Sequence, residues 1–461
     1  MMNKMIKKGD TFEINIDSLA YGGEGIGRLD GMTVFVPDSV TGDKLKIEIV
    51  SAKKNYARGI IKEIIEPSQY RIKPLCSLSK VCGGCQWLYV DYQEQLRAKK
   101  KIVEDSLKKI AHVDIPVFDV IPSDYQLEYR CKIQFPVQQT KVSKRILAGY
   151  YKKATHEIVN IKYCPIQPEI INGITQFIRE KAQELNLTAY SENTRKGLIR
   201  HLVYRYSQYD KNLLLIIVIN SQEIPDKLNQ LCKIVMNEYK ELAGILVNFN
   251  TSGTNVIMSN KTELVCGSDY IEENLEGKVF KVSASSFFQV NPAVAVKIFN
   301  EVHKIVQKKM EKPTILDVYA GVGTFSIWLK DLASKITAIE ENPHAVSDAK
   351  ENIKLNKSAN DVDIEMIEGN ADEVLQTLVN NNRTFDITVL DPPRKGCSSA
   401  AIDLVARLTG KYIIYVSCNP ATLARDIKLL MESGFIPEFA QPIDMFCHTY
   451  HIESIVVLKK Q

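Results

Sequence analysis

The chain has 461 residues, of which 45% are hydrophobic and 25% are charged, and its formal net charge is +4. This composition excludes a mainly disordered chain, because it supplies enough apolar side chains to build packed cores. No stretch approaches the roughly 18 consecutive apolar residues of a membrane-spanning helix, which excludes a membrane protein. The first residues carry no apolar signal segment and no small-residue cleavage site, so we expect a cytoplasmic protein.

Residues 7–66 predict a small closed β-barrel. Apolar and polar residues alternate over 14–19, 33–36 and 45–50, and glycine-rich turns separate these stretches. Residues 1–110 hold 19 basic and 14 acidic side chains, whereas the rest of the chain holds 40 and 41. Small barrels of this kind bind single-stranded nucleic acid. The basic front of the chain therefore indicates either a polyanion-binding module or simply solvated surface lysines.

The middle of the chain mixes helices and strands. Residues 92–112 predict a basic helix with one apolar face, and 213–219 predict a strongly apolar strand before a helix over 225–241. Within this region residues 125–162 carry 8 basic and only 2 acidic side chains. This basic segment adds to the positive charge that could bind a polyanion.

From about residue 283 helices and strands alternate, which predicts a doubly wound and mostly parallel sheet. Ligands of such sheets bind at the carboxyl ends of the strands. Helices are expected at 293–308, 324–332, 343–355, 400–408 and 420–432, and strands at 314–318, 335–339, 364–367, 386–390, 412–416 and 452–458.

Residues 315–324 have the pattern of a cofactor site, an apolar strand followed by a Gly-x-Gly turn and a helix. Glu340 ends the next strand, where a carboxylate can bind both hydroxyls of a ribose. Ser326 replaces the third glycine of the dinucleotide fingerprint, which favours an adenosyl group without phosphates, such as S-adenosylmethionine. Gly-x-Gly turns without a ligand are also common.

Asp391 follows another predicted strand and begins the sequence Asp-Pro-Pro-Arg-Lys-Gly. The two prolines enforce a rigid, extended loop at the edge of the sheet. This loop would direct Asp391 toward a bound ligand, although a simple break between strand and loop is the alternative.

Cys418 lies between a predicted strand and a helix that Pro420 can open. The N–H groups at a helix N-terminus favour a thiolate, so we expect the pKa of Cys418 to lie below its ordinary value of about 8.5. Glu453 stands at the start of the last apolar strand, where a carboxylate can act as a general base. The alternatives are a buried, inert cysteine and a surface glutamate.

Four cysteines have the spacing of a metal site. Cys76, Cys82 and Cys85 form a C-x5-C-x2-C pattern, and Cys164 is followed by a proline. Four thiolates suit zinc or an iron–sulfur cluster, and the Cys-Pro dipeptide favours the cluster.

Together these motifs resemble the TRAM-domain-containing family of RNA uracil-C5 methyltransferases. The resemblance covers nearly the whole chain. It is carried by residues 19–28 and 34–37 for the TRAM domain, the four cysteines for a [4Fe-4S] cluster, 197–202 and 286–291 for the central signatures, and 391–394, 417–420 and 448–453 for the catalytic motifs.

The resemblance implies an α/β chain of three domains. Residues 1–68 would form an OB-like TRAM barrel that binds RNA. Residues 69–280 would form a central α+β domain with the iron–sulfur cluster and an RNA-binding surface, and its helix at about 93–112 could dock on the catalytic domain. Residues 281–461 would form a Rossmann-like, S-adenosylmethionine-dependent methyltransferase domain.

The resemblance also assigns roles to single residues. Cys418 would be the nucleophile and Glu453 the general base. The residues that would contact S-adenosylmethionine are Gln289, Tyr319, Glu340, Asp391 and Asn370, and the cluster ligands would be Cys76, Cys82, Cys85 and Cys164.

The implied reaction is methyl transfer to C5 of a uridine in RNA through a covalent bond between Cys418 and C6. The TRAM domain and cluster ligands favour 23S ribosomal RNA as substrate, and we expect a monomer. A tRNA (uracil-5-)-methyltransferase and a non-catalytic iron–sulfur RNA-binding protein are the alternatives. The presence of both Cys418 and Glu453 argues against the second, and the lack of a Pro-Cys dipeptide argues against cytosine methylation.

Overall fold

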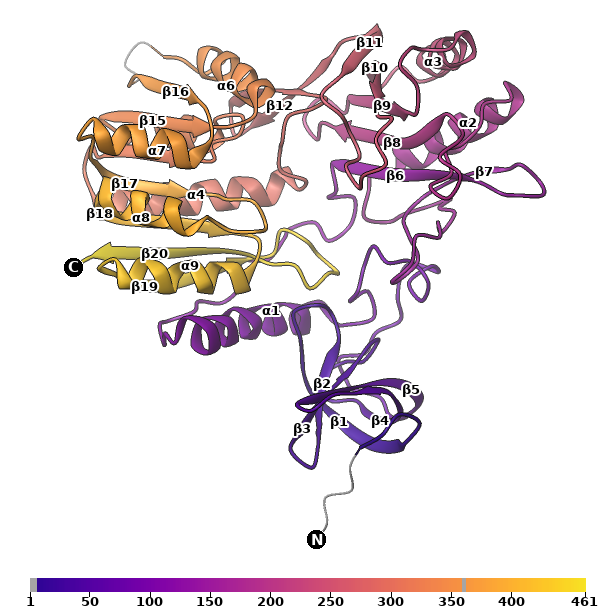
Figure 1. Cartoon of the computed structure of the whole chain (residues 1–461), viewed down its shortest axis with the longest axis horizontal. Coiled ribbons are helices and arrows are strands. Elements are labelled where there is room, and N and C mark those ends of the chain that lie inside the picture. The colour runs from indigo at the N-terminus through magenta and orange to yellow at the C-terminus, as the bar shows by residue number, and fades with distance from the viewer. Residues whose placement is uncertain (1–5, 359–361) are drawn as a thin grey trace.

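The computed structural model describes residues 6–358 and 362–461. Along the chain it contains a closed barrel, a six-stranded sheet and a seven-stranded sheet, with helices packed on both sheets (Figure 1). Within the described residues no helix is long and apolar enough to cross a membrane.

The predicted N-terminal barrel is confirmed, with the strand order β1-β2-β3-β5-β4. Strands β1 and β4 pair antiparallel and close it. Inward side chains alternate with exposed ones, as a barrel with a filled interior requires. The strands are β1 (Thr11–Leu19), β2 (Gly25–Leu29), β3 (Met32–Val36), β4 (Lys44–Ala52) and β5 (Tyr56–Glu66).

The central sheet has the order β11-β10-β9-β8-β6-β7. Every residue of β9 is buried, because alternate side chains pack into two different cores. Leu215 and Ile217 share one core with helices α2 and α3, whereas Leu214 and Ile216 share the other with helix α4 of the C-terminal part. The elements are β6 (Lys132–Gln139), β7 (Ile146–Ala148), β8 (Ile199–Tyr206), β9 (Leu213–Ile219), β10 (Leu242–Phe249), β11 (Thr262–Gly267), α2 (Glu169–Glu184) and α3 (Asp226–Glu238).

The C-terminal sheet has the order β16-β15-β14-β17-β18-β20-β19, and the pairs from β16 to β18 are parallel. Strand β20 runs antiparallel between β18 and β19. The predicted doubly wound sheet is therefore confirmed, with two antiparallel strands added at one edge. Its strands are β14 (Thr314–Val318), β15 (Lys335–Glu340), β16 (Ile364–Glu368), β17 (Phe385–Leu390), β18 (Thr409–Ser417), β19 (Phe435–Ile443) and β20 (Glu453–Lys460).

Helices cover both faces of this sheet (Figure 1). Side chains of α4 and α5 pack into the core on one face, and those of α7, α8 and α9 into the core on the other. The hairpin β12 (Tyr270–Leu275) and β13 (Lys278–Ser283) contributes to the first of these cores. The helices are α4 (Pro292–Lys309), α5 (Thr324–Leu329), α6 (Pro343–Leu355), α7 (Ala371–Asn380), α8 (Ser399–Leu408) and α9 (Pro420–Glu432).

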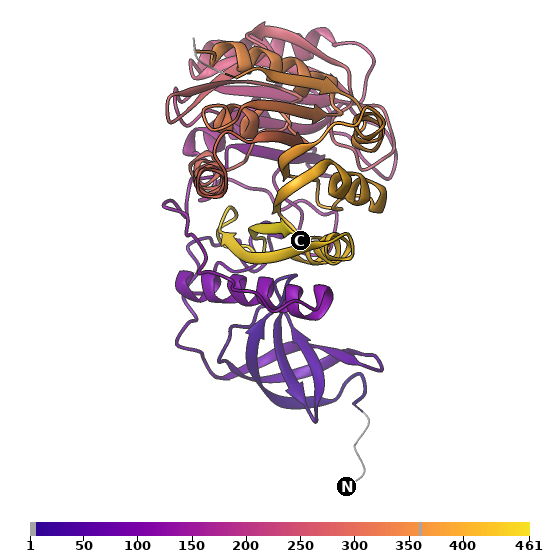
Figure 2. The same ribbon diagram turned by 90° about the vertical axis from the view of Figure 1, so that its left-hand side faces the viewer.

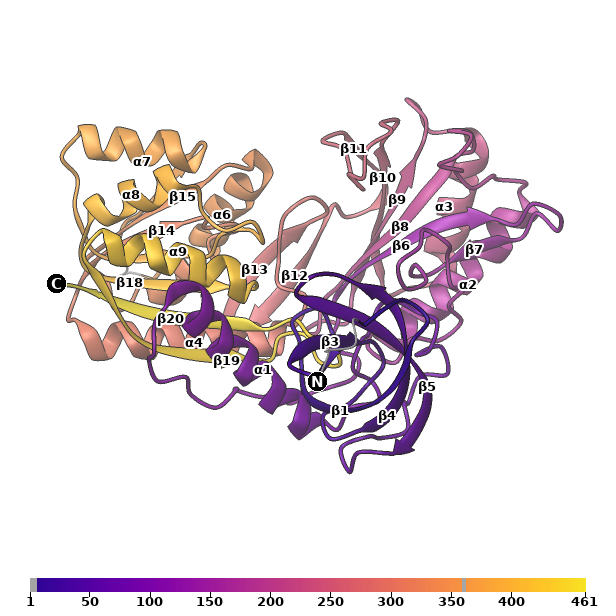
Figure 3. The same ribbon diagram turned by 60° about the horizontal axis from the view of Figure 1, so that its bottom comes forward.

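Helix α1 (Tyr92–Ser106) and the short π-helix that follows it, η1 (Leu107–Ala111), lie against α9, between the barrel and the C-terminal sheet (Figure 2). Val103 and Leu107 are buried in the same core as α8 and α9. Figure 3 shows the same helix running beside β19 and β20 toward the barrel. The first helix after the barrel, α1, thus packs into the core of the C-terminal sheet.

Candidate active site and cysteine pocket

Strand order brings the predicted catalytic residues to one edge of the C-terminal sheet. Tyr319, Asp391 and Cys418 directly follow β14, β17 and β18, which are neighbouring parallel strands. Strand β20 is antiparallel to β18, and Ser454 pairs with Ser417. Glu453, one residue before Ser454, therefore lies at the same edge as Cys418.

The turn after β14 has the backbone expected of a close approach to a ligand. Tyr319, Gly321 and Gly323 have φ values of 68°, 57° and 82°, in the left-handed region. The Gly321 N–H donates to Glu340 Oε2 at 2.9 Å, so the carboxylate at the end of β15 holds this turn.

A second carboxylate lies below the turn. The Ser326 hydroxyl donates to Asp317 Oδ2 at 2.6 Å, whereas the buried Oδ1 has no hydrogen-bond partner among the described residues. Burial raises the pKa of Asp317 to about 6. Burial, followed by the charge of Asp317, raises the pKa of Asp391 to about 7. A cluster of carboxyl groups with an unused acceptor thus lies where a cofactor would bind.

The remaining predicted cofactor residues are more peripheral. Gln289 is half-buried in the loop before α4. Asn370 is exposed and caps helix α7, where its Oδ1 accepts the Asp372 N–H at 3.0 Å. This cap already uses the Asn370 side-chain oxygen.

The expected low pKa of Cys418 is wrong. Burial raises the pKa to about 12, and the nearby carboxyl groups of Glu453 and Asp391 raise it further, while Arg394 opposes them. Asn419 caps α9 by accepting the Ala421 N–H at 3.1 Å, so this N–H is not free to stabilise a thiolate. Two acidic neighbours and burial therefore outweigh the helix terminus that the sequence revealed.

Glu453 is fully surrounded by protein. Burial and then the charge of Asp391 raise its pKa well above the ordinary value, and Arg394 acts in the opposite direction. Because the pKa values of Glu453 and Cys418 are both raised, positive charge placed beside these two groups would favour their deprotonated forms.

The structure adds two groups to this site that sequence reasoning missed. Arg394 belongs to the Asp-Pro-Pro-Arg motif, and its charge acts on both Cys418 and Glu453. Tyr21 comes from the turn between β1 and β2 of the barrel, and its ring centre lies 5.1 Å from that of Tyr450. Burial first, then Tyr450 and Cys418, raise the pKa of Tyr21 to about 12. The proximity of Tyr21 to Cys418 depends on how the barrel packs against the rest of the chain, and no local sequence motif predicts that packing.

Helix α1 holds the loop that precedes Glu453. Lys99 Nζ donates to Asp444 Oδ1 at 2.5 Å and to the Phe446 carbonyl at 3.0 Å, and Lys99 and Asp444 have no exposed surface. Gln95 Oε1 accepts the His448 N–H at 3.0 Å. Burial lowers the pKa of His448 to about 4, so this residue is neutral at pH 7.

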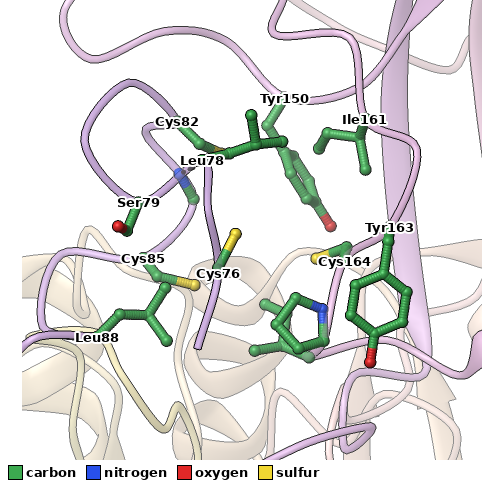
Figure 4. A pocket seen from close by; sticks show the side chains of 13 residues that line it. Cys76, Leu78, Ser79, Cys82, Cys85, Leu88, Tyr150, Ile161, Tyr163 and Cys164 are labelled. Atoms are coloured by element: carbon green, nitrogen blue, oxygen red, sulfur yellow. Dashed lines mark hydrogen bonds between the residues drawn. The ribbon is translucent and has the colours of Figure 1, made fainter. Parts of the chain in front are cut away.

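The four predicted ligand cysteines line one pocket (Figure 4). In this view the side chains of Cys76, Cys85 and Cys164 extend toward the space between them. The Gly84 N–H donates to Cys82 Sγ at 3.4 Å. Over residues 6–358 and 362–461, no group of three or more His, Cys, Asp or Glu side chains is arranged to hold a metal ion.

Burial and the neighbouring thiols disfavour thiolates in this pocket. Burial, before the charges of Cys164 and Cys82, raises the pKa of Cys85 strongly, and burial likewise raises the pKa of Cys164 to about 11. The buried hydroxyl of Tyr150, which also lines the pocket, has no hydrogen-bond partner in the described part of the chain. The pocket thus gathers four thiols and a free hydroxyl around one space.

Comparison with known proteins places this geometry in context. Residues 91–461 match the family described as tRNA (Uracil-5-)-methyltransferase, and residues 6–62 match the TRAM domain. An uncharacterized RNA methyltransferase of Clostridium acetobutylicum is 36% identical over 99% of this chain and 98% of its own length. One from Caldanaerobacter subterraneus is 34% identical over the full length of both chains.

A solved structure has the same overall arrangement. The Pyrococcus abyssi tRNA (uracil-54, C5)-methyltransferase, in complex with S-adenosyl-L-homocysteine, is 26% identical to this chain. It superposes with a TM-score of 0.75 and covers 97% of this chain and 99% of its own.

Proposed function

The chain belongs to the RNA uracil-5-methyltransferase family and is a methyltransferase with an N-terminal TRAM barrel, and from this we propose that it methylates C5 of a uridine in RNA with Cys418 as nucleophile. The observation that carries the proposal is the convergence of Cys418, Glu453 and Asp391 at the strand edge that also holds the glycine-rich turn. A thiol, an acid–base group and a cofactor site are the three parts that this reaction needs.

The residues at the glycine-rich turn fit S-adenosylmethionine. Asp317 Oδ1 is a buried acceptor without a partner, and Glu340 ends the neighbouring strand, in position to accept from ribose hydroxyls. Tyr319, Asp391, Gln289 and Asn370 would complete the binding site. When bound, S-adenosylmethionine supplies an electrophilic methyl group on a positively charged sulfur.

Cys418 loses its proton to water and adds its sulfur to C6 of the target uracil, and the electron pair of the C5–C6 double bond moves onto C5 and O4, which makes C5 nucleophilic. After C5 has gained the methyl group, Glu453 takes the C5 proton, and Cys418 leaves as the C5–C6 double bond re-forms. Burial and the nearby carboxyl groups raise the pKa values of Cys418 and Glu453, so positive charge beside them favours the thiolate and the carboxylate that the reaction uses. Arg394 supplies part of that charge, and the cofactor sulfur would supply more.

We propose further that Cys76, Cys82, Cys85 and Cys164 hold a [4Fe-4S] cluster. The cationic irons would offset the cost of four thiolates in one buried pocket. The Gly84 N–H already donates to Cys82 Sγ at 3.4 Å, and the Tyr150 hydroxyl has no partner among the described residues, so both groups could stabilise cysteine sulfurs that hold a cluster. The cluster would join the 76–85 loop to Cys164 and take no part in methyl transfer.

For the substrate we propose 23S ribosomal RNA, on the combination of a TRAM barrel with four cluster cysteines. Transfer RNA is the second candidate, because the Pyrococcus abyssi structure of similar architecture is that of a tRNA methyltransferase. We also propose that the protein acts as a monomer.

The test is incubation of the purified protein with S-adenosylmethionine and, separately, unmodified 23S ribosomal RNA and transfer RNA. Nuclease digestion and mass spectrometry then measure 5-methyluridine. The proposal expects product in ribosomal RNA and none with a Cys418→Ala variant. Product only in transfer RNA would select the second candidate, and lack of product in both would overturn the proposed function.

A further inference from the structure

A groove of about 700 Å³ separates the barrel from the central domain beside the active site. Residues of the β1–β2 turn form one wall and residues 150–156 form the other. Its size lies within the range of small-ligand pockets, so it can hold one nucleotide. We propose that this groove binds a nucleotide adjacent to the target uridine in the RNA, with its base packed on the aromatic side chains. This inference rests on the proposed function.

Two buried polar atoms in this groove have no partner. The hydroxyl of Tyr89 and the Oε1 of Gln86 make no hydrogen bond within the described residues. An unsatisfied buried polar atom is destabilising, so such atoms call for a ligand or water. A nucleoside in the groove would contact these two side chains, and it offers donors and acceptors that a small side-chain rotation would bring to the hydroxyl and the amide oxygen.

Aromatic rings supply the second part of the site. Tyr151 and His156 stack with ring centres 5.1 Å apart and planes inclined by 26°, and both line the groove. Unpaired nucleobases bind to proteins by stacking on such rings.

The groove leads to the catalytic residues. Tyr450 lines it, and the ring of Tyr450 lies 4.2 Å from His451 and 5.1 Å from Tyr21 between centres. Tyr21 in turn is close enough to Cys418 for the two to influence each other's charge. A base in the groove and a uracil at Cys418 would therefore be separated by Tyr21 and Tyr450, which suits neighbouring nucleotides of one strand.

The charges around the groove are nearly balanced. Lys153 pairs with Asp38 at 2.6 Å across the two walls, and Lys152 pairs with Glu157 at 2.5 Å. A phosphate entering the groove would have to replace one of these carboxylates. This site would therefore bind RNA by stacking and hydrogen bonding rather than by a general attraction for polyanions.

The experiment uses the full-length protein and an RNA oligonucleotide that spans the uridine the wild type methylates. A set of these oligonucleotides has one flanking nucleotide at a time replaced by an abasic residue, and fluorescence anisotropy measures Kd. We expect one abasic position to weaken wild-type binding about tenfold. Tyr151→Ala should weaken binding of the intact RNA by a similar factor and remove the effect of that abasic position.

Tyr89→Phe is the sharper variant, because it removes only the unpartnered hydroxyl. It should weaken RNA binding about two- to tenfold while leaving the thermal midpoint unchanged or higher. Tyr209→Ala is the matched control for Tyr151→Ala, and Tyr209→Phe for Tyr89→Phe, since Tyr209 is an exposed tyrosine of the central domain that does not line the groove. A purely structural role for Tyr89 would lower the midpoint and leave RNA affinity unchanged.

The outcomes separate this inference from the proposed function. If the wild type methylates no RNA, the proposed function fails. If the wild type methylates RNA but Tyr151→Ala and Tyr89→Phe bind it normally, or Tyr209→Ala weakens binding as much as they do, the groove is not the subsite.

Discussion

The buried pair Lys99 and Asp444 gives the most demanding test of how α1 supports the active site. Both side chains are completely buried, and Lys99 also donates to the Phe446 carbonyl. Lys99→Met keeps the length of the side chain but leaves the Asp444 carboxyl without its cation. The loop that carries Asp444 runs directly into Glu453, so its displacement should also reach the catalytic edge.

The size of the effect follows from the burial of the pair. Removing one partner of a fully buried ion pair costs about 3–5 kcal/mol, because the other charge stays buried without compensation. For a domain of 150–250 residues, each kcal/mol lowers the thermal midpoint by about 2–4 °C, which gives a decrease on the order of 10 °C. Lys100→Met is the matched control on the same helix, since Lys100 pairs with Asp119, whose side chain is 95% exposed. That exposed pair contributes at most about 1 kcal/mol.

Differential scanning calorimetry and initial methylation rates measure the two consequences. We expect Lys99→Met to lower both the midpoint of the C-terminal domain and kcat, and Lys100→Met to leave both nearly unchanged. A double variant, Lys99→Met with Asp444→Leu, should recover most of the stability, because apolar replacement of both partners removes the unpaired charge. If the two single variants have equal midpoints, the buried pair does not hold the loop and the argument is wrong.

Four further predictions concern the chemistry. Cys418→Ala should abolish 5-methyluridine formation but retain S-adenosylmethionine binding in calorimetry, and measurable turnover would remove Cys418 as nucleophile. Glu453→Gln should accumulate a covalent protein–RNA adduct on a denaturing gel, whereas release at the wild-type rate would reject its role as base. Because the pKa of Asp391 is about 7, the fraction of Asp391 that is a carboxylate increases from pH 6 to 8, and the affinity for the cationic cofactor should increase with it. An Asp391→Asn variant with the same pH dependence of affinity would contradict this. Protein purified without oxygen should contain iron and sulfide in equal amounts and lose both in Cys85→Ser, and one equivalent of zinc instead would reject the cluster.

Periodicity predicted the elements of the C-terminal sheet well where burial is regular. The strand expected at 314–318 matches β14 residue for residue, and the helix expected at 420–432 matches α9. Strand β19 was not predicted, because Pro437 and Pro442 interrupt its apolar pattern and proline is rarely found in a central strand. The structure accommodates them because β19 lies at the sheet edge and its pairing is irregular between Pro437 and Phe439. Helix α7 was also missed, although Asn370 and Asp372 are ordinary signals of a helix start.

The position of Cys418 could be predicted from sequence, whereas its protonation could not. A strand–cysteine–helix pattern is local, and the structure has it. The pKa depends on Asp391 and Glu453, which come from two other strands and meet Cys418 only through the order β17-β18-β20. Strand order is set by packing over the whole sheet. The sequence around Cys418 therefore predicts the helix terminus, which favours a thiolate, but it does not predict the two carboxyl groups that oppose a thiolate.

The cysteine pocket and the groove share a wall, so the proposed cysteine site would act on the proposed RNA-binding groove rather than on the catalytic edge. Gly84 and Tyr150 line both spaces, and Cys82 pairs through its backbone with Lys152, inside the loop that carries Tyr151 and His156. A group that ties the 76–85 loop to Cys164 would therefore fix the rings on which a base can stack. Cys418 and Glu453, in contrast, are held by the strands of the C-terminal sheet and by the loop that α1 supports. Loss of the cysteine site should consequently impair RNA affinity before it impairs the bond-making steps, which separates the two roles physically.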